Sequence, residues 1–144
     1  MAITQTTCTS FKVELLKAEH DFDVDTFKIA LYTSSATLDA STTAYSAVNE
    51  ITNTSGAAYT AGGESLTVAS TFPKSIGTTA IVDFDNVSWA DATFTARGGL
   101  IYNSSASNKA VAVLDFGSDR SASASTFEIQ FPIAGATSAI IRIT

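Results

Sequence analysis

The feature that most constrains the fold is the stretch from Ala80 to Phe116, where apolar segments follow one another with only short polar runs between them. These segments are rich in β-branched and aromatic residues, and the single tryptophan, Trp89, lies among them. Consecutive segments of this kind are typical of antiparallel strands, so the stretch predicts the middle of a β core. The segments are residues 80–84, 87–89, 93–103 and 109–116.

Alternation of apolar and polar residues, the pattern of a half-buried strand, continues on both sides of this stretch. In residues 126–131 it places Phe127, Ile129 and Phe131 on one face. Residues 110–114 are apolar on both faces, which indicates a strand covered on both sides. Further strands are expected at 27–33, 64–70 and 139–143, and Ser-rich loops at 103–108 and 117–125.

Only one segment has helical spacing. Phe11, Leu15 and Ala18 recur on one face, which predicts a short helix over residues 10–20 that covers one end or face of the sheets. Residues 1–9 before it are polar and unpatterned, and they predict an arm that is either loose or laid against a partner.

A long polar connection over residues 34–63 separates the first strand from the rest, and such loops are usually functional or bound to a partner. The chain of 144 residues has the size of one domain, covering residues 1–144 with a β core over 27–144. We therefore expect an all-β fold, a β-sandwich or small barrel of about seven or more short antiparallel strands with one short N-terminal helix. Its core is expected around Trp89, Phe94, Leu114, Phe127 and Ile129.

The charge of the chain bears on its partners. It carries 14 acidic and 8 basic residues, and the basic residues are scattered singly. Because phosphate backbones are bound chiefly by clustered Lys and Arg, no nucleic-acid partner is expected. No run approaches the roughly 18 apolar residues of a membrane span, so no membrane partner is expected either. Only 15% of the residues are charged, and a Ser- and Thr-rich surface suits contact with another protein.

The single cysteine and the single histidine do not predict an enzyme. Cys8 cannot form an intrachain disulfide, and it has no basic neighbour that would lower its pKa and make it a nucleophile. His20 beside Asp21 fits the exposed end of the predicted helix better than a catalytic pocket. The first residues lack the basic and apolar runs of a signal peptide, which predicts folding in a reducing cytosol. We therefore predict no catalytic residue.

Asp21, Asp23 and Asp25 resemble the start of a calcium loop. An EF-hand would need a Gly after the third Asp and a Glu at its twelfth position, where this chain has Thr26 and Tyr32. We therefore expect a charged bend between helix and strand, with a non-standard calcium site as the alternative.

Two glycine pairs, Gly62–Gly63 and Gly98–Gly99, lack the Lys-Ser/Thr of a phosphate loop. The first pair predicts a turn. The second pair interrupts the alternation of a strand and predicts a β-bulge or tight bend. Neither glycine pair indicates a cofactor site. For the chain as a whole we predict no metal and no cofactor.

A resemblance to a known family adds to this account. Segments Phe27–Leu38 (FKIALYTSSATL), Tyr59–Leu66 (YTAGGESL), Trp89–Asn103 (WADATFTARGGLIYN) and Val113–Gly117 (VLDFG) resemble a family of small virion structural proteins of tailed bacteriophages. The resemblance spans most of the chain and implies a multicopy component of a phage particle, assembled in the host cytoplasm and located in the virion.

Within that family, a small acidic chain without disulfide or fibrous repeat suits a capsid decoration (cement) protein. Such a protein binds the outer face of the assembled head, so its partners are the major capsid protein and sister copies, and it stabilises the shell by mass action. The alternatives are a tail or neck component and a carbohydrate-binding module that attaches the particle to its host.

Residues 1–9 and 34–63 are expected to make much of the contact with the capsid or sister copies, because they have too little apolar pattern to build core. Asp39 and Glu50 are the only charged residues in them, so binding is expected to depend weakly on salt.

Overall fold

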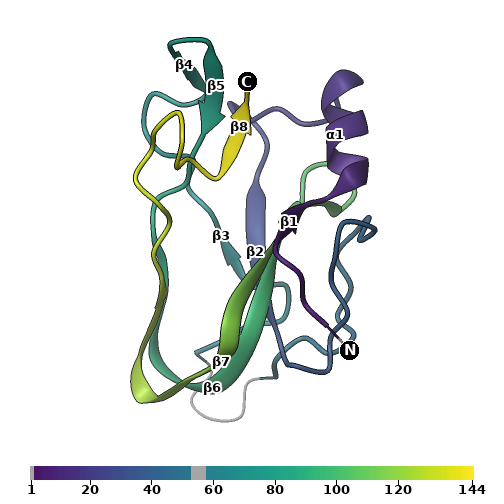
Figure 1. Ribbon diagram of the computed structural model, residues 1–144. Coiled ribbons are helices and arrows are strands. Elements are labelled where there is room, and N and C mark those ends of the chain that lie inside the picture. Colours follow the sequence, from purple (N-terminus) through teal and green to yellow (C-terminus); the bar gives the residue numbers. More distant parts are fainter. Residues whose placement is uncertain (1, 53–57) are drawn as a thin grey trace.

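The structure is a computed structural model that describes residues 2–52 and 58–144 (Figure 1). Its one helix is α1 (Thr9–Leu16), and its strands are β1 (Thr6–Thr7), β2 (Phe27–Tyr32), β3 (Glu64–Ser65), β4 (Lys74–Ile76), β5 (Thr79–Val82), β6 (Val87–Asn103), β7 (Lys109–Ile129) and β8 (Ile141–Ile143). The strands form a five-stranded sheet, β1-β7-β6-β2-β3, and a three-stranded sheet, β4-β5-β8. Neighbouring strands are antiparallel. The predicted all-β fold with one short helix is confirmed, and its described strands close no barrel.

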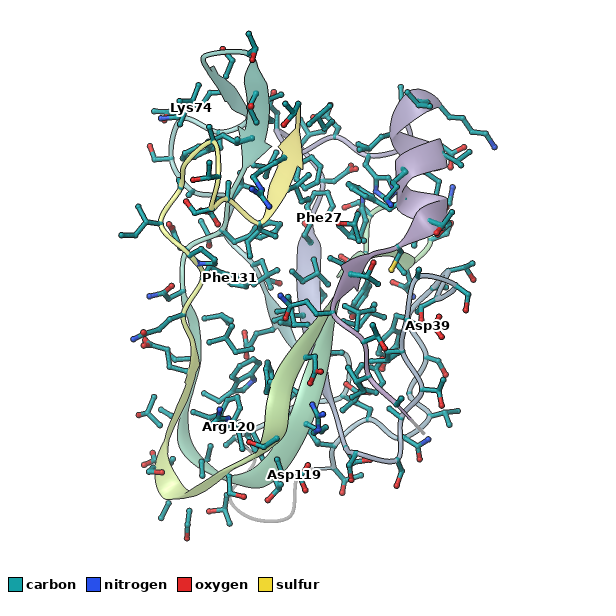
Figure 2. All side chains as sticks on the ribbon, viewed as in Figure 1. Phe27, Asp39, Lys74, Asp119, Arg120 and Phe131 are labelled. Carbon is teal, nitrogen blue, oxygen red and sulfur yellow. The ribbon has the colours of Figure 1, made fainter. Side chains whose placement is uncertain are left out.

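The long hairpin of β6 and β7 dominates the fold. Its strands pair from Asn103 opposite Lys109 to Val87 opposite Ile129. The register shifts at several places along the pair, and Figure 1 shows the hairpin bending sharply near its middle. Because an extra residue in one strand bends it and increases its twist, these shifts account for the bend. Asp119 lies in this region of the hairpin (Figure 2).

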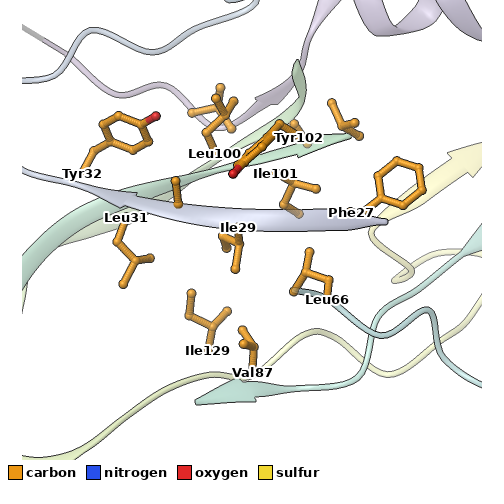
Figure 3. Packing of buried hydrophobic residues seen from close by; sticks show 14 of the residues in the cluster. Phe27, Ile29, Leu31, Tyr32, Leu66, Val87, Leu100, Ile101, Tyr102 and Ile129 are labelled. Atoms are coloured by element: carbon orange, nitrogen blue, oxygen red, sulfur yellow. The ribbon is translucent and has the colours of Figure 1, made fainter. Parts of the chain in front are cut away.

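The bend allows one hairpin to build both layers of the core. Figure 3 shows Val87 and Ile129, from the far end of the hairpin, facing Ile29 and Leu31 of β2. All four of these side chains are at most 9% exposed. The near end of the hairpin pairs with β2, where Ile29 lies opposite Ile101. The far end of the hairpin thus packs over the side chains that β2 and the near end present on one face of their sheet.

The predicted loop over residues 117–125 is wrong, because these residues belong to β7. They pair with the middle of β6, for example Ser121 with Thr95, whose hydroxyl oxygens are 2.7 Å apart. Pairing with β6 satisfies the backbone hydrogen-bonding groups of this part of β7, and its side chains face outward. A Ser-rich sequence can therefore form a strand here without apolar alternation.

The predicted bulge at the second glycine pair is confirmed, because the register shifts between Ala96 and Gly98. A Cβ atom on Gly98 would lie 2.5 Å from the backbone oxygen of Leu114 and 2.8 Å from Ile3. The close approach of the arm to the hairpin therefore requires glycine at this position.

The predicted core residues Trp89, Phe94, Phe127 and Ile129 are all less than 9% exposed, while Leu114 is half-buried. The rings of Trp89, Phe94 and Phe127 contact one another, with the Phe94 and Phe127 centroids 5.0 Å apart. Aromatic pairs at such distances stabilise a core beyond their buried area.

Replacing Phe127 with alanine is expected to lower the free energy of unfolding by roughly 3–5 kcal/mol, because the change empties a ring-sized space in this aromatic group. Urea denaturation of both proteins measures the difference. Ser123→Ala, at an exposed position of the same strand, is the control and is expected to change stability by less than about 0.5 kcal/mol. A neutral Phe127→Ala variant would remove this ring from the core.

The expectation that residues 1–9 and 34–63 build no core is wrong. In the arm, Ile3 is 6% exposed and Cys8 is fully buried, and β1 pairs with β7. In the connection, Leu38 and Ile51 are buried, and Leu38 forms a parallel bridge with Ile3. Single apolar residues held by main-chain pairing thus enter the core without any periodic pattern.

The helix is shorter than the predicted 10–20. It ends at Leu16, and Ala18 adopts a left-handed conformation with a φ of 58°. Cys8 occupies the N-cap position without a side-chain hydrogen bond. The reversal after Leu16 carries residues 19–22 back beneath the helix, where the His20 ring lies 4.8 Å from the Phe11 ring.

Candidate functional site

A polar cluster gathers the four tyrosines of the chain around Glu50, with the Tyr32 hydroxyl donating to the nearby Ser46 carbonyl at 2.7 Å; we call it the tyrosine network. It consists of Tyr32, Tyr45, Glu50, Tyr59 and Tyr102. The Tyr45 hydroxyl donates to Glu50 Oε2 at 2.7 Å, and the Tyr59 hydroxyl donates to Glu50 Oε1 at 2.6 Å. Glu50 is only 8% exposed, so these donors replace the water that its carboxylate would otherwise bind.

The same network attaches the long connection to the strands beneath it. Tyr59 comes from the connection, and its hydroxyl accepts a hydrogen bond from the backbone N–H of Leu31 in β2 at 2.9 Å. Tyr102 comes from β6 and donates to the Gly62 carbonyl at 2.7 Å, while the Gly62 N–H donates to Glu50 at 2.7 Å. The connection is therefore fixed by buried hydrogen bonds rather than by a run of apolar residues.

Burial controls the ionisation of these phenols. It raises the pKa values of Tyr59 and Tyr32, and the negative charge of Glu50 adds to both shifts. Burial likewise raises the pKa of Tyr45, reinforced by its hydrogen bond to Glu50, and the pKa of Tyr102. The phenols thus remain neutral donors around a buried carboxylate, an arrangement that rigidifies structure.

A second cluster surrounds the single histidine; we call it the histidine network. It consists of Glu14, His20, Asp25 and Asn103. His20 Nε2 lies 2.8 Å from Glu14 Oε2, and His20 Nδ1 lies 3.1 Å from Asn103 Nδ2. Asn103 Nδ2 also donates to Asp25 Oδ2 at 2.7 Å. The network links α1, the segment after it and the turn of the long hairpin.

The expectation of an exposed His20 is wrong, because its side chain is fully buried. Asn103 Oδ1 accepts from the backbone N–H groups of Ser105 and Ala106, so Asn103 Nδ2 must be the atom that faces the histidine. A donor facing Nδ1 makes that nitrogen an acceptor and leaves the proton on Nε2, which donates to Glu14. The His20 ring is buried because α1 ends at Leu16 and the chain then reverses at Ala18.

Replacing His20 with alanine is expected to lower the free energy of unfolding by about 1–3 kcal/mol, because the partly buried carboxylate of Glu14 and the buried amide of Asn103 each lose a hydrogen-bond partner. Thermal or urea unfolding at pH 7 measures the effect. His20→Gln, which can supply a donor and an acceptor, is expected to restore part of the loss. Unchanged stability of His20→Ala would show that water replaces the imidazole without penalty.

The other residues singled out in the sequence have local roles. Cys8 is fully buried at the start of α1, and burial raises the pKa of its thiol to about 11. In the predicted charged bend, the Asp21 N–H donates to Asp25 Oδ2 and the Asp23 N–H donates to Asp21 Oδ1, each at 2.9 Å. Within residues 2–52 and 58–144, no group of three His, Cys, Asp or Glu side chains is placed to hold a metal ion.

Comparison with protein-family models, curated proteins and solved structures gave no match. In the part of the chain that the structure describes, α1 is far too short to cross a membrane, and no other helix is present.

Proposed function

We propose that the chain is a structural protein of a tailed-bacteriophage particle and acts as a decoration (cement) protein on the outer face of the assembled head. Its partners in this proposal are the major capsid protein and sister copies of the chain, and its role is to bind and stabilise rather than to catalyse. The proposal starts from the four segments that resemble phage virion proteins.

One structural observation carries the proposal: the four segments lie together. They contribute to every strand of the five-stranded sheet except β1. They also supply three of the four phenols of the tyrosine network, Tyr32, Tyr59 and Tyr102. The resemblance thus falls on one connected framework, as expected if it reflects a shared fold rather than isolated matches.

The outer face of the hairpin suits contact with another protein. Thr95, Ser121, Ser123 and Ser125 are exposed along its bent middle and present uncharged hydroxyl groups, next to the exposed charges of Asp119 and Arg120. Polar uncharged side chains lose less solvation free energy than ions when a partner covers them. A shell protein that must be covered at many equivalent sites benefits from such a face.

The charged residues of the long connection are already engaged within the chain. Asp39 accepts hydrogen bonds from the N–H and the hydroxyl of Ser41, and Glu50 is buried in the tyrosine network. Glu50 is therefore shielded from a neighbouring subunit, and Asp39 is the one carboxylate of this connection that is partly exposed. Because screening by salt acts mainly on exposed charges, binding through it depends weakly on ionic strength.

The test uses phage particles that lack the protein. Purified protein is added back, and its copy number on the particles and the temperature at which they release DNA are measured at low and high salt. A decoration protein is expected to bind in roughly hundreds of copies per head. Its binding is expected to raise the temperature of DNA release. Copies in the tens on a tail or neck would support the tail component, and a few copies at the host-binding tip would support the carbohydrate-binding module.

A further inference from the structure

An apolar groove lies between the three-stranded sheet and the helical end of the molecule. Leu15 of α1 and Phe22 line one side, and Val82 of β5 with Ile141 and Ile143 of β8 line the other. Its volume is about 180 Å³. Ile143 is 57% exposed although it lines this groove, so part of the apolar surface faces solvent.

The strand beside the groove has an open edge. β8 pairs with β5 on one side, and no strand within the described ranges pairs with its other side. Figure 1 shows β8 on the side of its sheet that faces α1, and residues of α1, β5 and β8 line the groove together. An edge strand beside apolar pockets is the arrangement that an extended segment of another protein can join as an added strand.

The alternation of β8 specifies what that segment must carry. Ile141 and Ile143 pair with Val82 and Ala80, so these four residues share one face of the sheet, and all four line the groove, as does Ile81 of β5. Arg142 lies on the opposite face, in a row with Ile81 and Lys74. Lys74 is labelled in Figure 2 on this small sheet. A strand added at β8 would therefore place apolar residues in the groove and face Arg142 on the other side.

The charge of Arg142 determines which residue of an added strand is favoured directly opposite it. Arg142 Nη1 donates to the Thr137 carbonyl at 2.7 Å, and among the described residues no carboxylate forms an ion pair with it. An opposite charge directly across two strands stabilises their pairing, whereas a like charge destabilises it.

This rule disfavours a second copy as the occupant. Two copies joined through β8 about a two-fold axis, in the register that pairs all three residues, would place Arg142 opposite Arg142 of the second copy. The cationic edge is instead complementary to a strand with an acidic residue at its centre.

We propose that β8 receives an extended segment of the head shell with the pattern apolar–acidic–apolar, which adds a fourth strand to the β4-β5-β8 sheet. The two apolar side chains enter the groove beside Ile141 and Ile143, and the carboxylate pairs with Arg142. This inference rests on the proposed function, because it takes the shell protein as the source of the segment.

The test measures binding of the intact protein to particles that lack it. Ile143→Asp is expected to weaken binding about tenfold or more, because a charge replaces an apolar side chain in the groove. Ile133→Asp is the matched control, because Ile133 is 88% exposed and does not line the groove. Arg142→Glu is expected to weaken binding, and Arg142→Lys to retain most of it. Thermal unfolding of each variant checks that the fold is intact.

The outcomes separate the two proposals. If the wild-type protein does not bind the particles at all, the proposed function fails and this inference falls with it. If the wild-type protein binds and both Ile143→Asp and Arg142→Glu bind equally well, only this inference is overturned. If the protein forms a dimer in solution and Ile143→Asp dissociates that dimer, this inference is also overturned, because the groove would then bind a second copy of the chain.

Discussion

The folded protein is expected to lose about 2.7 kcal/mol of stability for each pH unit above 10, because two buried tyrosines keep their protons while the unfolded chain releases them. Tyr32 and Tyr59 are each at most 3% exposed, and burial raises the pKa of each far above its ordinary value. Below pH 10 both states hold these protons, so stability does not depend on them. Above pH 10 the unfolded state binds fewer protons, so the free energy of unfolding falls as pH rises.

Urea denaturation at a series of alkaline pH values measures this slope, and absorbance of tyrosinate reports the ionisation directly. The absorbance is expected to appear together with loss of the β circular-dichroism signal. Tyr59→Phe removes one of the two protons and is expected to reduce the slope by about 1.4 kcal/mol per pH unit. Full ionisation near pH 10 with an unchanged circular-dichroism spectrum would show that the phenols are accessible in the folded protein.

Gly63→Ala is expected to leave most of the protein unfolded, with a loss of at least about 5 kcal/mol. The residue has a φ of +76°, and a Cβ atom there would lie 1.7 Å from the backbone oxygen of Ile29. That oxygen belongs to β2 at the point where Ile29 lies opposite Glu64 of β3. The methyl group would therefore force apart the strand pair that carries the end of the long connection.

A second glycine separates the two causes of this effect. Gly77 also has a positive φ, +60°, but a Cβ atom on it would meet nothing within 4 Å. Gly77→Ala thus isolates the backbone strain and is expected to cost about 1–2 kcal/mol. Thermal unfolding of both variants measures the difference. Equal losses would mean that β2 and β3 separate without penalty, contrary to the packing described here.

Alternation in the sequence predicted the strands that bury one face. Phe127 and Ile129 are buried as their spacing indicates, and the apolar segment at 110–114 lies within a covered strand. Alternation does not reveal a strand whose side chains all face outward, which is why the Ser-rich part of β7 was expected to be a loop. There the pairing partner, and not the sequence itself, determines the conformation.

The two polar networks could not be predicted in the same way. Tyr45, Tyr59 and Glu50 come from a segment without pattern, and they meet Tyr102 only because β2 pairs with β6. One signal was available: Glu50 is one of two charged residues in a long polar connection that carries two tyrosines. His20 was misplaced because helical spacing continues beyond Leu16, whereas the backbone reverses at Ala18.

The reactivity of the buried Cys8 thiol reports whether the N-terminal arm is attached to β7. Cys8 is fully buried directly after β1, and its pKa of about 11 leaves little thiolate at neutral pH. A thiol reagent can therefore modify it only in molecules whose arm has separated from β7. The labelling rate gives the free energy of that local opening, and a bound neighbour that covers the arm would slow it without any change to the sequence.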